Sequence, residues 1–441
     1  MKACIENGKF GRMLALGAVA VATLLALFLA AATPGVAAVH AANPGPHEWL
    51  LAAVNDGALS VVDTSMDVVY GPFLSGELGS AGGGLFDVAV TPDGKTALVS
   101  NFGDSAVYFV DVSNPISPSV ITSVTLSMFA EDIAIDPHGE FALVTDGGFS
   151  YVIDVIDLIS RTLAYSVTLP SYGAQAVDIA DDGTVVTVDY FASVVQSLYP
   201  DASGHLTVTG IYTFALPSAS LSTASMGAAL LSEESEPAWQ TRDENDRQVQ
   251  AVSAEELFYP RPVNVAIAPD GQTVIVPGVS AYGTPTDTLY ALGVYKILEP
   301  GVLTFTQALI GLPRAAQSVA FSTDGKKAYL SGNGAVMEEY DYNRLMVLDI
   351  LGPGQAQLAS DNAADFPRLT SSQLFGVDTI AVASGKAYMG YPTLSGARND
   401  LRVVNLSDYG VRSLTMPGIV AGVAAIPTNR VYLPLIVRND M

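Results

Sequence analysis

A short unit of two apolar strands joined by a tight turn recurs along this chain of 441 residues. Its clearest copies, at 86–101 and 131–146, read FDVAVTPDGKTALVSN and EDIAIDPHGEFALVTD. Five further copies, the last two weaker, lie at 175–189, 263–277, 317–331, 378–390 and 421–434. The apolar alternation indicates strands, and Pro-Asp-Gly or Asp-Asp-Gly indicates a turn whose glycine has a positive φ. One hairpin cannot bury its apolar face alone, so the copies must pack against one another.

The spacing of the turns indicates how the hairpins are arranged. Where no insertion intervenes, the turn glycines recur about every 44 residues, which suits four short strands and their turns, one blade of a β-propeller. The strand before each turn carries small apolar residues, as the crowded inner strand of a blade requires. A third strand tends to end in an aspartate that we interpret as a turn cap: Asp63, Asp111, Asp157 and Asp349. The sequence therefore predicts an all-β fold, a seven-bladed β-propeller of four-stranded antiparallel blades.

The two ends of the chain complete the ring in this prediction. Residues 49–73 supply three strands without an inner one, and the last inner strand lies near 423–426. Pairing of that C-terminal strand with the N-terminal three would hide the free sheet edges. A further strand-like segment at 431–437 competes with Trp49–Val54 for the second position of the closing blade, so the register there stays open.

The first 41 residues differ in character from the rest. Three basic residues precede an uninterrupted apolar stretch at 13–32, and small residues follow Pro34-Gly35. This order is typical of a secretory signal peptide, and the alternative is an uncleaved anchor, because the stretch is long enough to span a bilayer. We expect a signal peptide at 1–41 and the propeller at 42–441, with an acidic inserted loop at 217–260. The rival interpretation of the insertion, an eroded extra blade, lacks a strand–turn–strand pattern.

Composition limits the partners and the chemistry. The chain has 20 basic against 44 acidic residues, a formal net charge of −24 at pH 7, which disfavours nucleic acid and anionic membranes and suits cations or basic partners. The single cysteine, Cys4, lies before the apolar stretch, so the mature chain has no disulfide and no thiolate. We expect a monomer that is secreted or held at the cell surface, without a membrane span after signal cleavage, and that binds an unknown extracellular ligand or protein.

The repeat register places polar residues around the mouth of the central channel. Asp87, Asp132 and Asn264 lie seven residues before their turn glycines, and the shorter sixth turn puts Asp378 or Thr379 in the same place. Hard oxygen ligands of this type suit Ca²⁺ or Mg²⁺. The alternative is a hydrated ring whose carboxylates cap strand ends. No cofactor is certain, and Ca²⁺ is the candidate.

Insertions gather on one face of the predicted propeller, which usually marks the binding face, although drift of exposed loops is the alternative. They lie at 217–260 and 351–375 between blades, and at 278–289, 332–344 and 390–401 within blades. The candidate ligand-binding residues on this face are Asn101, Asp146, Asp189, Asn333, Glu338, Tyr340 and Tyr342. Aromatic residues such as Phe102, Phe149 and Tyr190 stand among them. An acidic, tyrosine-rich rim can grip a sugar, a cationic group or a basic peptide.

The repeats also carry a family resemblance. Thr91-Pro92-Asp93-Gly94-Lys95, followed by Asn101 and Val110-Asp111, resembles the YVTN-type β-propeller repeat, and the segment at 110–115 is similar to the related LVIVP repeat. The resemblance covers nearly all of the mature chain and is specific for the fold rather than for the function. The wider group includes lactonase-like enzymes and surface proteins, so the resemblance implies that hydrolysis is an alternative to binding.

Familiar catalytic constellations find little support in the sequence. The four histidines, His40, His47, His138 and His205, fall in the N-terminal region or in turns away from the channel mouth. There is no Gly-x-Ser-x-Gly elbow and no phosphate-binding loop. The sequence therefore predicts an exported, non-enzymatic propeller that binds a ligand or protein on its acidic, tyrosine-rich top face. The alternative hypothesis is a metal-assisted, lactonase-like hydrolase that uses the carboxylate ring.

Overall fold

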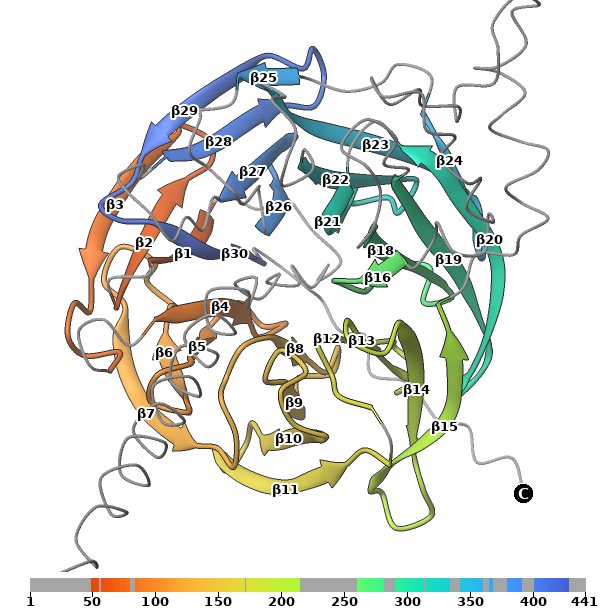
Figure 1. The fold of residues 1–441 in the computed structure, drawn as a ribbon. Coiled ribbons are helices and arrows are strands. Elements are labelled where there is room, and N and C mark those ends of the chain that lie inside the picture. The colour runs from red at the N-terminus through yellow and green to blue at the C-terminus, as the bar shows by residue number, and fades with distance from the viewer. Residues whose placement is uncertain are drawn as a thin grey trace, which may run out of the picture.

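The computed structural model describes residues 49–54, 57–79, 84–170, 172–214, 260–280, 290–312, 315–333, 342–359, 365–367, 379–390 and 400–427. These residues form seven antiparallel sheets arranged in a ring (Figure 1), so the prediction of a seven-bladed β-propeller is confirmed. They include no helix, and hence none long and apolar enough to cross a membrane. The predicted signal peptide, the insertion up to residue 259 and the segment 431–437 lie outside the described residues.

The basic blade is a meander of four strands, a to d, from the channel outward. In blade 1 these are β4 (Leu85–Val90), β5 (Thr96–Asn101), β6 (Ala106–Asp111) and β7 (Ser119–Thr125). Strands β4 to β6 are mostly buried on both faces because the neighbouring blades pack against them, whereas the outer strand β7 is largely accessible to solvent. This is why the inner strands read as nearly continuous apolar runs.

The other blades follow in chain order. Blade 2 comprises β8 (Ile133–Ile135), β9 (Phe141–Val144), β10 (Val152–Asp157) and β11 (Thr162–Thr168). Blade 3 comprises β12 (Ala176–Ile179), β13 (Val185–Asp189), β14 (Val194–Pro200) and β15 (Leu206–Thr213). Blade 4 comprises β16 (Pro260–Pro262), β17 (Ala266–Ile267), β18 (Thr273–Ser280), β19 (Tyr290–Glu299) and β20 (Val302–Leu312). Blade 5 comprises β21 (Ala315–Phe321), β22 (Lys327–Asn333), β23 (Tyr342–Gly352), β24 (Gln355–Leu358) and β25 (Asp365–Pro367), and blade 6 comprises β26 (Thr379–Ala383), β27 (Lys386–Gly390), β28 (Asp400–Asn405) and β29 (Val411–Thr415).

Blades 4 and 5 depart from the four-stranded pattern. In blade 4, β16 and β17 share the inner position and both pair with β18. In blade 5, β24 and β25 both pair with β23. The prediction that 351–375 is a connection between blades was therefore wrong, because this range contains two strands. Strand β24 has only four residues and directly follows Gly352-Pro353-Gly354, so it is too short for periodicity to distinguish it from a loop.

The meander gives the ring two distinct faces. The a–b and c–d turns lie on one face, here called the bottom face, and the b–c loops and the connections between blades lie on the other, the top face. The turn glycines of the repeats have φ values from 67° to 87°, as predicted: Gly94, Gly139, Gly183, Gly271, Gly325 and Gly385. Asp63, Asp111 and Asp157 each accept a hydrogen bond from a backbone amide two or three residues later, which confirms three of the predicted caps.

Blade 7 closes the ring as predicted from the two chain ends. Its inner strand β30 (Val420–Ile426) pairs antiparallel with β1 (Trp49–Val54), with Trp49 opposite Ile426. The blade is completed by β2 (Ala58–Asp63) and β3 (Val68–Phe73). The second position of the closing blade, left open by the sequence, therefore belongs to Trp49–Val54.

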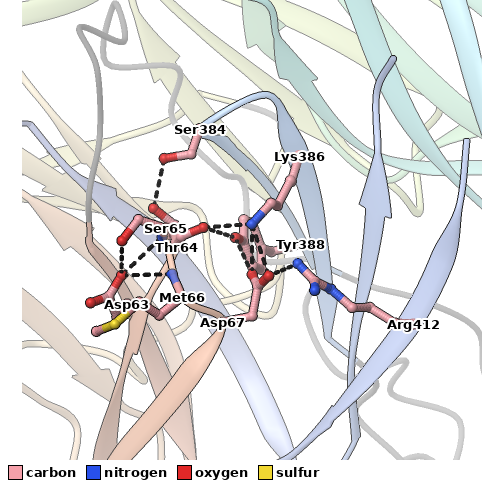
Figure 2. Close-up of polar contacts among 9 residues, drawn as sticks. All are labelled: Asp63, Thr64, Ser65, Met66, Asp67, Ser384, Lys386, Tyr388 and Arg412. Atoms are coloured by element: carbon pink, nitrogen blue, oxygen red, sulfur yellow. Dashed lines mark hydrogen bonds and ion pairs between the residues drawn. The ribbon is translucent and has the colours of Figure 1, made fainter. Parts of the chain in front are cut away.

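A polar cluster on the bottom face, here called the Asp67 clasp, fastens blade 7 to blade 6 (Figure 2). The Asp67 carboxylate accepts hydrogen bonds from Lys386 Nζ at 2.8 and 3.0 Å and from the Tyr388 hydroxyl at 3.0 Å, and it pairs with Arg412. Lys386 also donates to the Thr64 carbonyl at 2.6 Å. The side chains of Asp67 and Lys386 are only 5% and 17% exposed, so each charge depends on its protein partners. The clasp joins residues 319 positions apart in the sequence.

Candidate functional site

Two of the residues predicted to ring the channel mouth connect neighbouring inner strands. The Asp87 carboxylate accepts a hydrogen bond from the Ile133 amide of blade 2 at 3.1 Å. The Asp132 carboxylate accepts one from the Val177 amide of blade 3 at 2.9 Å. Both aspartates are buried. An inner strand has no further strand on its channel side, so amides that point there need another acceptor, and these carboxylates supply it.

Two further junctions between blades use the same device. Asp178 accepts a hydrogen bond from the Ile267 amide at 2.7 Å, and the Thr379 hydroxyl accepts one from the Val423 amide at 3.2 Å. The sequence prediction did not include Asp178, because that residue stands five rather than seven positions before its turn glycine. The acceptor position therefore shifts with the local register of each inner strand.

Of the other two residues of the predicted metal site, Asn264 and Asp378, the structure describes only the first. Asn264 is buried, and neither polar atom of its side-chain amide has a hydrogen-bond partner among the described residues. Asp378 lies outside those residues. Within the described part of the chain, no three aspartate, glutamate, histidine or cysteine side chains are placed to hold a metal ion. The calcium site stays a prediction.

The candidate residues at the ends of the b strands shape the top-face loops. Asn101 Oδ1 accepts a hydrogen bond from the Asp104 amide at 2.9 Å, and Asp189 Oδ1 accepts one from the Ala192 amide at 2.8 Å. Each side chain thus caps the loop that follows its own strand. The residues that lie outside the described part of the chain, wholly or in their side chains, are Asn333, Glu338, Tyr340 and Tyr342.

Four phenylalanines from blades 1 and 2 gather on the top face and form the phenylalanine cluster: Phe86, Phe102, Phe129 and Phe149. The rings of Phe102 and Phe129 stack with their centroids 4.4 Å apart. Phe102 also contacts Phe86 and Phe149, with centroid distances of 5.0 and 6.4 Å. Phe129 and Phe149 are 45% and 47% exposed. Exposed aromatic rings packed against one another form an apolar patch of the kind that marks an interaction site.

The aromatic surface continues into blade 3. Phe191 is exposed, and its ring lies 5.4 Å from that of Tyr190. Arg261 of β16 places its guanidinium carbon 5.0 Å from the centroid of the Tyr190 ring. A Cβ built on Gly148 would stand 3.8 Å from the Phe191 ring, so the loop that carries Phe149 reaches the blade 3 aromatics. The surface already accommodates one cation–π contact.

Two buried carboxyl groups are close in sequence to the phenylalanine cluster: Glu131 follows Phe129 by two residues, and Asp146 precedes Phe149 by three. Glu131 and Asp146 are 3% and 1% exposed. A Cβ on Gly147 would stand 1.9 Å from Glu131 Oε2, so only a glycine leaves room for that carboxyl group. Glu131 Oε1 accepts a hydrogen bond from Gln175 Nε2 at 3.4 Å. Oδ1 of Asp146 is buried and has no hydrogen-bond partner among the described residues.

The electrostatics of this pair are unfavourable for negative charge. Burial raises the pKa of Glu131 well above its usual range, and repulsion from Asp132 and Asp146 raises it further. Burial also raises the pKa of Asp146, against hydrogen bonds from Ser150 and the neighbouring backbone. Carboxyl groups that stay buried with too few partners destabilise the fold. Perturbed groups of this type collect at functional sites more often than elsewhere.

Glu131→Gln is expected to stabilise the protein at pH 8 by about 1 kcal/mol, because a neutral amide fits the buried position better than a carboxylate. The pKa of Glu131 is higher in the folded than in the unfolded chain, so its stability contribution is complete at low pH and declines as the pH rises through the folded-state value. The gain should therefore shrink towards pH 4. Thermal unfolding of both proteins across this pH range measures it.

Glu140→Gln provides the control for this experiment. Glu140 lies in the same blade and is exposed, so its replacement removes the same charge without relieving burial. We expect no pH-dependent gain from this variant. A Glu131→Gln protein no more stable than the wild type at pH 8 would show that the buried carboxyl group carries no such penalty.

The aromatic character of the top face was only partly predictable. The sequence pattern predicted Phe102, Phe149 and Tyr190 on this face but did not indicate Phe129 or Glu131. Both lie in the connection just before an inner strand. The one feature of the sequence that could have indicated them is an aromatic and an acidic residue directly before the repeat. The rim was predicted to be rich in tyrosine, whereas the exposed rings of the described top face are mainly phenylalanines.

Comparison with known proteins places the fold. No family model and no curated protein matches the sequence. A functionally unknown protein from Desulfotomaculum acetoxidans superposes with a TM-score of 0.61 at 15% identity over 86% of this chain and 99% of that one. A protein from Lactobacillus plantarum gives 0.56 at 13% identity over 86% and 98%, and Kuenenia stuttgartiensis hydrazine synthase gives 0.52 at 14% over 78% and 90%. Likeness at this level of identity shows the fold alone, a β-propeller.

Proposed function

We propose that this protein is an exported, non-enzymatic β-propeller that binds a partner or ligand on its top face. The observation that carries the proposal is the phenylalanine cluster, in which Phe129 and Phe149 are about half exposed. Aromatic side chains are enriched at the centres of protein interfaces, where they act as anchors. The formal net charge of −24 favours a basic partner.

Export and family membership belong to the same proposal. The basic, apolar and small residues of 1–41 support secretion or retention at the cell surface after cleavage. The repeat at 91–101 supports membership of the YVTN-type propellers. Pairing with β30 leaves β1 without a free edge, which supports a monomer.

The positions of the described catalytic candidates favour binding over hydrolysis. His138 lies in the a–b turn of blade 2 and His205 in the c–d turn of blade 3, both on the bottom face. The carboxylates of Asp87 and Asp132, which the hydrolase alternative would use to hold a cation, accept backbone hydrogen bonds from the next blade. Neither set supplies a base or a metal ligand to the phenylalanine cluster.

Selection of displayed peptides against the purified protein tests the proposal. Wild-type protein is expected to enrich a family of peptides that bind the top face. Phe129→Ser combined with Phe149→Ser is expected to weaken their binding at least tenfold, because truncation of anchor residues costs about 2 kcal/mol or more. Both side chains are half exposed, so the double variant should fold normally, which its thermal unfolding verifies.

A control variant separates this effect from a general change in surface hydrophobicity. Ile116 and Ile159 are 48% and 82% exposed in c–d turns of the bottom face. Ile116→Ser combined with Ile159→Ser should leave peptide binding unchanged. Equal binding by the wild type and the Phe129 and Phe149 double variant, or failure of the wild type to enrich any peptide family, would refute the top-face proposal.

A further inference from the structure

We infer that the partner presents an arginine to the top face, whose guanidinium stacks on the phenylalanine cluster and pairs with the carboxyl groups of Glu131 and Asp146. Both carboxyl groups are buried in the free protein, so this pairing requires the loop that carries Gly147, which covers Glu131, to move aside on binding. The inference rests on the proposed function and specifies its recognition chemistry. The occupant is thus a basic peptide segment of another protein, rather than a neutral sugar or an anionic molecule.

The aromatic half of this site suits a flat cation. Within the phenylalanine cluster, Phe102 contacts both Phe129 and Phe149, with centroid distances of 4.4 and 6.4 Å. The faces of aromatic rings attract guanidinium groups, and this attraction increases when water is excluded. The chain itself shows this chemistry on the adjoining surface, where Arg261 stacks over Tyr190 at 5.0 Å.

The acidic half of the site supplies hydrogen-bond acceptors and negative charge, which the aromatic rings lack. Oδ1 of Asp146 is buried without a hydrogen-bond partner among the described residues, while the other polar contacts of this side chain are to Ser150 and its neighbours. Glu131 accepts a long hydrogen bond from Gln175, at 3.4 Å. A guanidinium carries five donors in a planar fork, which matches two carboxyl groups better than an ammonium group does.

Charge complementarity selects the basic partner over the other occupants of an aromatic patch. Asp132 and Asp146 disfavour negative charge on Glu131, and one entering positive charge would offset that repulsion. A neutral sugar could stack on the rings but would leave the carboxyl groups unpaired. An anionic ligand would add to the repulsion.

The inference has a thermodynamic signature that simple docking lacks. Burial raises the pKa of Glu131 in the free protein, which favours the protonated form of this carboxyl group relative to an exposed glutamate. Pairing with a guanidinium requires the ionised form, and binding must then release protons. Calorimetric heats measured in buffers of different ionisation enthalpy report that release directly.

Isothermal titration calorimetry with the purified protein and two capped pentapeptides tests the inference. The probes are Gly-Phe-Arg-Phe-Gly and its citrulline counterpart, which keeps the shape of arginine but not its charge. We expect the arginine peptide to bind the wild type at least tenfold more tightly than the citrulline peptide, with proton release. Combined Glu131→Gln and Asp146→Asn substitutions are expected to remove both the preference and the proton release.

A matched variant controls for the overall negative charge of the protein. Glu140→Gln combined with Asp157→Asn removes two acidic charges from bottom-face turns of the same blade. This variant should retain the preference for arginine. If the control variant lost the preference for arginine as fully as the Glu131 and Asp146 variant, the overall negative charge rather than the carboxyl pair would select the peptide.

The outcomes distinguish this inference from the proposed function. Equal affinity for the arginine and citrulline peptides, with binding still lost in the Phe129 and Phe149 double variant, would overturn the arginine inference and leave the top-face site standing. Enrichment of neutral peptides in the display selection would do the same. Absence of binding by either pentapeptide to the wild type would also overturn the inference, while the selection would still decide the proposed function.

Discussion

Asp67→Ala is expected to destabilise the propeller by roughly 3 kcal/mol, because it removes the carboxylate on which the Asp67 clasp converges. Lys386 would keep its hydrogen bond to the Thr64 carbonyl but lose its charged partner. Its side chain is only 17% exposed, so solvent would not replace that partner fully. The Tyr388 hydroxyl would lose its hydrogen bond to Asp67, 3.0 Å long in the native protein. A urea titration followed by tryptophan fluorescence measures the shift, since Trp49 lies in the closing blade.

The matched control for this prediction is Asp93→Ala. Asp93 also pairs with a lysine, Lys95, but the two side chains are 56% and 70% exposed and 3.8 Å apart. Solvent-exposed pairs contribute little, so we expect a change of about 0.5 kcal/mol or less. Asp67→Asn should fall between the two alanine variants, because it keeps an acceptor oxygen and loses the charge. Equal effects of Asp67→Ala and Asp93→Ala would show that the clasp does not hold the ring closed.

Asp132→Ala is the second substitution with a large expected effect, roughly 2–3 kcal/mol. Its carboxylate is the acceptor of the Val177 amide, 2.9 Å away, and the aspartate is buried. Truncation would leave that amide on the inner edge of β12 without this acceptor and would open a small cavity between blades 2 and 3. Asp132→Asn, which keeps an oxygen at the same place, should lose about half as much or less. The midpoints of thermal unfolding of the two variants provide the test.

The same variants separate the backbone role of these carboxylates from the predicted calcium site. If Asp87 and Asp132 act as hydrogen-bond acceptors between blades, the wild type should unfold at the same temperature with Ca²⁺ and with a chelator. A rise in stability with Ca²⁺ that disappears in the Asp87→Ala and Asp132→Ala double variant would instead establish the metal site. That outcome would revive the hydrolase alternative.

Local chemistry made much of the fold predictable from the sequence. A turn such as Pro92-Asp93-Gly94 specifies its own geometry, because the glycine has to adopt a positive φ, 72° in the structure. The Asp63 and Asp111 caps are equally local, with acceptors and donors only two residues apart. The number of repeated strand–turn–strand units then indicated the blade count, since each blade buries its faces against the next.

The contacts between blades were not predictable in the same way. The register correctly placed Asp87 on an inner strand and Asp132 directly before one. Their amide partners, Ile133 and Val177, belong to the next blade. The Asp67 clasp depends on a residue 319 positions away. Phe129 and Glu131 lie in a connection without periodicity, where neither alternation nor turn chemistry marks a position. Non-local packing decides these features, and a single sequence does not contain it in readable form.

Hydrogen–deuterium exchange of the protein with and without a peptide from the display selection tests the central claim most directly. If the phenylalanine cluster is the binding site, the peptide should slow exchange in the top-face segments 126–132 and 145–151, which carry Phe129 and Phe149. The bottom-face turns at 112–118 and 158–161 should remain unchanged and serve as the internal control. Protection confined to bottom-face turns, or to top-face loops other than those of blades 1 to 3, would contradict the account.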